Sequence, residues 1–102
     1  MRVKVQKAGN LAVFHIDHRM KHDAYVPGMD ELGFKQSELS HMMMSIHGVM
    51  KFCCEGYEVF VTKGSVFSWE EITPRVISVL SEYLGDSKVE NLGEINVLST
   101  QF

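Results

Sequence analysis

Residues 46–76 constrain the fold more than any other part of this chain, because their pattern implies a definite order of elements. Gly48 can adopt the left-handed backbone conformation that ends many helices. Two extended runs follow, at 49–54 and 57–63, and the second alternates in polarity as a half-buried strand does. Because Glu55 and Gly56 lie between the two runs, the pattern predicts a hairpin that turns there.

The later part of this stretch predicts a helix that begins in two steps. Ser68 and Glu71 have the spacing of a capping box, which satisfies backbone N–H groups at the start of a helix. A helix that ran through Pro74 would lack one backbone hydrogen bond, so we expect a capped turn and then a main helix with Thr73 as its N-cap. The apolar stripe of this helix ends near Gly85 and consists of Trp69, Ile72, Val76, Val79, Leu80, Tyr83 and Leu84.

The first third of the chain predicts a hairpin followed by an irregular segment. Residues 2–7 and 11–16 both alternate in polarity, and Gly9 and Asn10 between them suit a tight turn. Residues 17–36 follow neither the helical nor the strand period. We therefore expect one long loop there, of a length at which loops are often functional or mobile.

The remaining elements are a first helix and a last strand. Ser37 is a good N-cap, and apolar residues recur after it at helical spacing, namely Leu39, Met42, Met43 and Ile46. After a polar connector at 86–91, Ile95, Val97 and Leu98 suggest a short final strand. We predict an α+β fold with the order β-β-α-β-β-α-β, in which two helices pack on one face of a largely antiparallel sheet.

Length and composition predict one domain that spans residues 1–102. A chain of this length buries one modest core, and 45% hydrophobic and 23% charged residues are ordinary values for a globular protein. The net charge of −3 and the scattered Lys and Arg residues argue against nucleic-acid binding. There is no apolar run of membrane-spanning length and no signal-peptide pattern, so we expect a cytoplasmic protein without a membrane partner.

A cluster of potential metal ligands lies within nine residues and consists of His15, Asp17, His18, His22 and Asp23. Imidazole is the commonest metal-ligating side chain, so His15, Asp17, His18 and His22 form a candidate iron or zinc site. The simpler interpretation is a solvated loop that is rich in histidine, because the segment lacks the helical period that would bring His18 and His22 to one face. We expect that the chain binds no intrinsic cofactor. The alternative is that it binds iron.

The two cysteines and one methionine are the other candidates. Cys53 and Cys54 are adjacent, and neighbouring side chains of a strand point to opposite faces, so the two sulfurs cannot close on one ion. We expect both thiols to be reduced, with one in the core and the other facing outward. Met44 falls off the apolar stripe of the first helix, and we take Met44 and Cys54 as possible partner contacts.

No sequence motif indicates catalysis. The chain contains no P-loop, no G-x-G-x-x-G, no H-E-x-x-H and no G-x-S-x-G nucleophile elbow. We therefore predict that the protein is not an enzyme.

Several residues of the central stretch recur at the spacing of a known family: Ile46, Gly48, Val49, Phe52, Gly56, the run Val59 to Lys63, Trp69, Pro74 and Val76. With this pattern, residues 37–85 resemble the N-terminal domain of Nfu, the NifU-like iron–sulfur scaffold proteins. The resemblance implies a small α+β domain that serves partner or client recognition. In full-length members a C-x-x-C motif in a separate C-terminal domain holds the cluster. This chain has no such motif, so we expect a stand-alone domain of the N-terminal kind.

Three hypotheses of function follow. The first is a non-enzymatic adaptor in iron–sulfur cluster assembly or delivery, which contacts assembly factors or client apoproteins through the exposed sheet face and the 17–36 loop. The second is direct iron or zinc binding through His15, Asp17, His18 and His22. The third is a small structural or regulatory α+β domain whose resemblance is limited to the fold.

Overall fold

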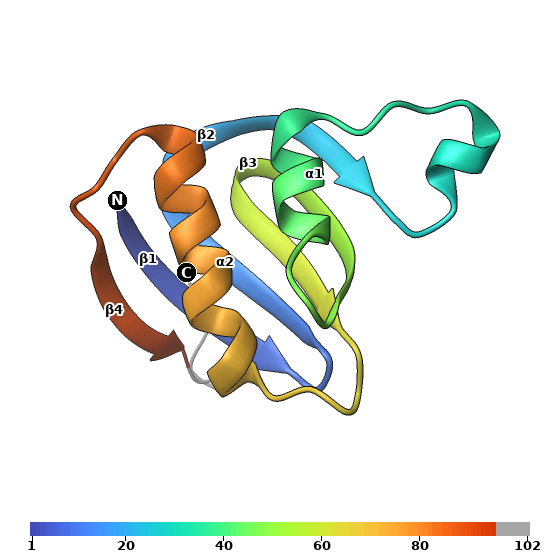
Figure 1. Cartoon of the computed structure of the whole chain (residues 1–102). Helices are drawn as coiled ribbons and strands as arrows, with labels where there is room; N and C mark the ends of the chain where they lie inside the picture. Colours follow the sequence, from blue (N-terminus) through green and yellow to red (C-terminus); the bar gives the residue numbers. More distant parts are fainter. Residues whose placement is uncertain (96–102) are drawn as a thin grey trace.

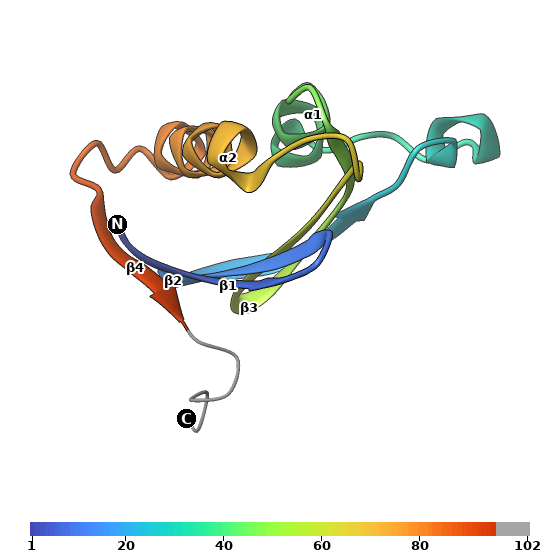
Figure 2. The ribbon, with the colours of Figure 1, turned by 90° about the horizontal axis from the view of Figure 1, so that it is seen from below.

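The protein forms a four-stranded sheet with two helices on one face (Figures 1 and 2). The computed structural model describes residues 1–95, and Val97 and Leu98 of the predicted last strand lie outside this range. In chain order the elements are β1 (Arg2–Ala8), β2 (Leu11–Tyr25), the 3₁₀ turn η1 (Met29–Leu32), α1 (Glu38–Met44), β3 (Val49–Lys63), α2 (Trp69–Leu84) and β4 (Glu90–Ile95). The predicted fold class is confirmed.

The sheet has the strand order β3-β2-β1-β4. β2 pairs antiparallel with both β1 and β3, whereas β4 pairs parallel with β1. Strand alternation sends one set of side chains toward the helices, including Val3, Phe14 and Val59, which have no exposed surface. The helices bury Met43 and Leu80 against these residues, so the core lies between the sheet and the helix layer.

β2 is longer than the sequence suggested, and the expectation of a loop over residues 17–36 is wrong for its first half. β2 continues to Tyr25, which pairs with Phe52 of β3. Its register shifts between His15 and Met20 and again between Met20 and Asp23. Such bulges interrupt the two-residue period, which is why the sequence pattern of this part of the strand does not alternate.

β3 is one continuous strand, so the hairpin predicted at Glu55 and Gly56 is wrong. The two extended runs both pair with β2, and Gly56 lies opposite Met20 between the register shifts. Gly56 has a φ of 61°, a conformation that glycine adopts without strain. In β3, Gly56 lets the strand continue through a bulge. The sequence pattern had instead predicted a turn at this glycine.

α2 passes through Pro74 without a break, so the restart predicted at Thr73 is wrong. The predicted cap at Ser68 is confirmed, because the Ser68 hydroxyl accepts a hydrogen bond from the Glu71 N–H group at 3.3 Å. Pro74 removes only one backbone donor from a helix whose inner face buries Val76 and Leu80 completely. Burial of this face therefore outweighs the local preference for a new start.

The interior position of Pro74 leads to a stability prediction. Pro74→Ala restores the missing N–H group at an exposed site, and we expect the free energy of unfolding to rise by about 2 kcal/mol. Urea unfolding followed by circular dichroism measures the change. The exposed neighbour Arg75 supplies the control, since Arg75→Ala is expected to change stability by less than about 0.5 kcal/mol. A loss of stability in Pro74→Ala would contradict this account.

The start of α2 is also tied to the turn between β1 and β2. The Trp69 indole N–H donates a hydrogen bond to the carbonyl oxygen of Gly9 at 2.8 Å. The ammonium group of Lys63 donates to the side-chain oxygen of Asn10 at 3.0 Å and lies 5.6 Å from the centre of the Trp69 ring. Lys63 and Trp69 therefore connect the end of β3 and the start of α2 to the β1–β2 turn, which is distant in sequence.

Candidate partner-binding surface

Within residues 1–95, both helices lie on one face of the sheet and no helix or strand covers the opposite face, as Figure 2 shows. Cross-strand neighbours on this face form two rows over β1, β2 and β3, with Lys4, His15 and Glu58 in one row and Gln6, Val13 and Phe60 in the other. We call these six residues the open-face patch. The rows are in contact, since the His15 Nε2 atom lies 3.2 Å from the Gln6 Oε1 atom.

The open-face patch combines two apolar side chains with four polar ones. Val13 and Phe60 are direct cross-strand neighbours and both are half-buried. Lys4 and Glu58 add exposed charges of opposite sign. Protein–protein interfaces commonly combine apolar contact area with polar and charged groups beside it.

A depression adjoins the patch between β1, β2 and β4. Its volume is 290 Å³, and its lining includes Lys4, His15 and the exposed side chain of Leu92. The depression extends the patch toward β4.

The structure separates the four predicted metal ligands. His15 lies on the open face, whereas His18 lies near the helix side, where its Nε2 atom is 3.1 Å from Asp86 Oδ2. His22 lies beyond the first register shift with its Nδ1 atom 3.9 Å from Glu55 Oε2. Among residues 1–95 there is no group of three or more His, Cys, Asp or Glu side chains placed to hold a metal ion.

Asp17 of this set has a local structural contact. Its carboxylate accepts a hydrogen bond from the Arg2 backbone N–H group at 2.9 Å, and this bond is the main cause of its lowered pKa. The Asp17 Oδ1 atom is 3.8 Å from His18 Nε2. Iron or zinc binding stays a prediction.

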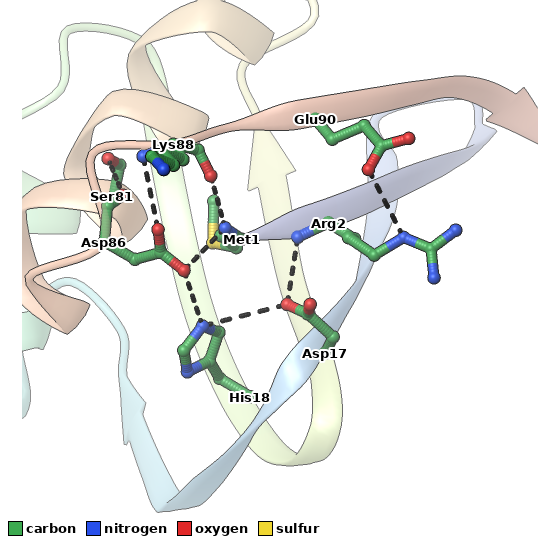
Figure 3. A network of polar contacts seen from close by, with 8 residues as sticks. All are labelled: Met1, Arg2, Asp17, His18, Ser81, Asp86, Lys88 and Glu90. Carbon is green, nitrogen blue, oxygen red and sulfur yellow. Dashed lines mark hydrogen bonds and ion pairs between the residues drawn. The ribbon is translucent and has the colours of Figure 1, made fainter.

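Figure 3 shows the polar network that contains His18. The amino group of Met1 donates to Asp86 Oδ2 at 2.6 Å and to the Lys88 carbonyl oxygen at 2.5 Å. Asp86 also receives the Lys88 N–H group at 3.2 Å, and its own carbonyl oxygen accepts from the Ser81 hydroxyl at 2.5 Å. The network joins the start of β1, the middle of β2 and the segment between α2 and β4. In the sequence, Asp86 lies in a polar connector, and no nearby residue indicates these partners.

The network predicts a pH dependence of stability. The Met1 amino group, and then His18, hold the pKa of Asp86 at about 2 instead of 3.8. A lowered pKa in the folded state stabilises the fold above the unfolded pKa, and this contribution is lost as the pH falls from about 4 toward 2. We expect Asp86→Asn to be less stable than the native chain at pH 7, with a difference that shrinks through this range.

Urea unfolding at pH 7, 4, 3 and 2 tests this dependence. Asp30→Asn is the control, because Asp30 is exposed and makes no ion pair within residues 1–95. A difference between Asp86→Asn and the native chain that stays constant from pH 7 to pH 2 would show that the carboxylate charge is not the cause.

One cysteine lies in the core and the other is partly exposed, as the sequence predicted. Cys54 is completely buried, so the expected partner contact through Cys54 is wrong in this structure. Its thiol donates to the Lys21 carbonyl oxygen at 3.3 Å, and burial raises its pKa to about 11. Cys53 is partly exposed, and burial together with the Glu55 carboxylate raises its pKa as well. Met44 is half-buried against the core, and its role as a partner contact stays a prediction.

Comparison with protein-family models and with curated proteins found no match. Among solved structures, the chain is similar to a NifU-like protein from Saccharomyces cerevisiae, with 20% sequence identity and a TM-score of 0.62 over 80% of this chain and 75% of that chain. It is also similar to the crystal structure of protein SAV1430 from Staphylococcus aureus, with 19% identity and a TM-score of 0.60 over 78% of this chain and 99% of that chain. These likenesses show a NifU-like fold. No helix within residues 1–95 is long and apolar enough to cross a membrane.

Proposed function

We propose that this chain is a non-enzymatic adaptor in iron–sulfur cluster assembly or delivery in the cytoplasm, and that it binds assembly factors or client apoproteins through the open-face patch. The NifU-like fold supports the choice of process. One observation carries the proposal of recognition: the helices cover one face of the sheet and leave Val13 and Phe60 accessible on the other.

The patch has properties that suit recognition. It lies on three paired strands, so its side chains are held by the sheet and lose little freedom on binding. Val13 and Phe60 supply apolar area, and Lys4 and Glu58 can orient a partner of complementary charge.

The chemistry of the thiols favours recognition over cluster carriage. Iron–sulfur clusters are bound by thiolates, and both thiols of this chain have raised pKa values. They are also neighbours on β3, so their side chains leave the strand on opposite sides. An adaptor that leaves the cluster to its partners needs neither thiol.

Affinity capture tests the proposal. The tagged chain is used to capture proteins from lysate, and mass spectrometry compares it with a double variant, Val13→Lys with Phe60→Lys. We expect iron–sulfur assembly factors or iron–sulfur apoproteins to be enriched by the native chain and lost with the double variant.

Two controls make the capture decisive. Val66→Lys adds charge at an apolar side chain that is 88% exposed but lies away from the sheet, and it should retain the enriched proteins. Circular dichroism and thermal unfolding establish that all variants are folded. If the native chain enriches no assembly factor or iron–sulfur protein above the level of the double variant, the adaptor role is rejected, and the structural or regulatory alternative takes its place.

Iron or zinc binding through His15, Asp17, His18 and His22 is the second candidate, and of these four Asp17 and His18 lie within 3.8 Å of each other. It predicts stoichiometric heat when the pure chain is titrated with Fe²⁺ without oxygen, or with Zn²⁺. This heat should disappear in the variant His15→Ala, His18→Ala, His22→Ala and persist in His47→Ala, which alters an exposed histidine elsewhere. The adaptor proposal predicts no stoichiometric heat in any of them.

A further inference from the structure

Residues 26–36 project from the sheet and helices as a separate arm (Figure 1). The arm contains η1 and two large apolar side chains, Leu32 and Phe34, which are 75% and 58% exposed. Side chains of this size and exposure on a projecting segment commonly contact another molecule.

The arm has a defined backbone shape. η1 begins and ends at glycines in the left-handed conformation, Gly28 with a φ of 90° and Gly33 with a φ of 87°. The Gly33 N–H group donates to the Asp30 carbonyl oxygen at 3.1 Å, and the Asp30 N–H group donates to the Tyr25 hydroxyl at 3.2 Å. Because these bonds form within the arm and its base, Leu32 and Phe34 are presented with little ordering left to occur on binding.

The arm is also acidic beside its apolar residues. Asp30 and Glu31 precede Leu32, both are exposed, and neither makes an ion pair within residues 1–95. A surface that binds this arm should therefore combine apolar side chains with positive charge.

The same chain carries a groove of that composition. It lies between the bulged part of β2, the start of α1 and the end of α2, and has a volume of 460 Å³. Its basic rim contains Arg19 and Lys21, both exposed and without an ion pair among the described residues. One acidic residue, Asp23, also lines the groove, and its carboxylate accepts a hydrogen bond from the Ser37 hydroxyl.

The apolar part of the groove comes from α2. Tyr83 is 44% exposed and Leu84 is half-buried, so both present surface to an occupant of the groove. The groove therefore offers aromatic and aliphatic contacts to Leu32 and Phe34, and positive charge to Asp30 and Glu31.

We propose that this groove binds the arm of a second copy of the chain, so that two copies exchange arms about a two-fold axis. Within one copy, α1 lies between η1 and α2 in both views (Figures 1 and 2), and no residue of the arm lines the groove. Each copy carries both the arm and the groove, which is the condition for an isologous dimer. The exchange is independent of the adaptor role, and it leaves the open-face patch accessible.

Sedimentation equilibrium of the full chain over a concentration series tests the exchange. We expect a reversible dimer that weakens as salt is added, because the charge pairs lie at a solvent-exposed rim. The double variant Leu32→Ser with Phe34→Ser should weaken dimerisation by tenfold or more, on the order of a hot-spot loss. Val66→Ser removes a comparably exposed apolar side chain elsewhere and should leave the dissociation constant unchanged.

A charge exchange identifies the contact directly. The arm variant Asp30→Lys with Glu31→Lys and the groove variant Arg19→Glu with Lys21→Glu should each be monomeric alone. Mixed together they should form a heterodimer, because a basic arm then meets an acidic groove and an acidic arm meets a basic groove.

A native chain that stays monomeric to about 1 mM overturns the proposal. Dimers unaffected by the arm variants, or no heterodimer on mixing, overturn it as well. None of these readouts depends on an iron–sulfur partner.

Discussion

Phe14→Ala is expected to lower the free energy of unfolding by about 3–5 kcal/mol. Phe14 lies on the central strand β2, has no exposed surface, and points into the core between sheet and helices. Its removal leaves a cavity that the paired strands on both sides cannot close, because Val5 and Val59 are held opposite Phe14 by the sheet register.

The loss is large compared with the total stability of a protein of this size, which is about 5–15 kcal/mol. Urea unfolding at pH 7 measures it through the shift of the midpoint. Phe60→Ala is the matched control, because Phe60 lies on the other face of the sheet and is only half-buried, and its expected cost is about 1 kcal/mol. Equal losses for the two phenylalanines would show that the core does not lie on the helix side.

Gly48→Ala is expected to destabilise the fold by about 3 kcal/mol, for two reasons that add. Gly48 has a φ of 102°, where a side chain is strained. A Cβ atom placed there would also lie 2.8 Å from Phe67 Cγ and 3.0 Å from Ile72 Cδ1. Phe67 cannot move away freely, because its ring packs edge-on against His47 with centroids 4.8 Å apart.

Gly9→Ala separates the cost of backbone strain from the cost of the close contacts around Gly48. Gly9 also has a positive φ, 62°, but a Cβ atom there would meet no atom within 4 Å. We expect Gly9→Ala to cost only the backbone strain, about 1 kcal/mol. Thermal unfolding of both variants gives the difference, which measures the close packing around Gly48. If both cost the same, the contact with Phe67 is relieved by movement.

Local patterns in the sequence predicted the layers of the fold but failed wherever long-range pairing overrides a local signal. The stripe of α2 and its cap at Ser68 are local, and they were predicted correctly. Gly56 and Pro74 are also strong local signals, yet both lie inside elements that tertiary contacts keep continuous. The second half of β2 was not predicted because its bulges interrupt the strand period. This half is held in the sheet by pairing with β3.

The candidate surface was predicted only in part. The sequence indicated an exposed sheet face, but it could not show which strands are neighbours, so the rows that contain His15 and Val13 were not predictable. The histidine cluster illustrates the same limit. Its members are close in sequence, and the strand places His15 and His18 in different surroundings.

The position of β1 between β2 and β4 has a consequence for folding order. β1 comes first in the chain, but one of its two edges is paired with β4, which is separated from it by more than eighty residues. Until β4 forms, this edge presents free backbone groups that can pair with another chain. Closing so distant a pair is slow compared with forming the β1–β2 hairpin. The β1 edge is thus open to pairing with another chain until β4 docks.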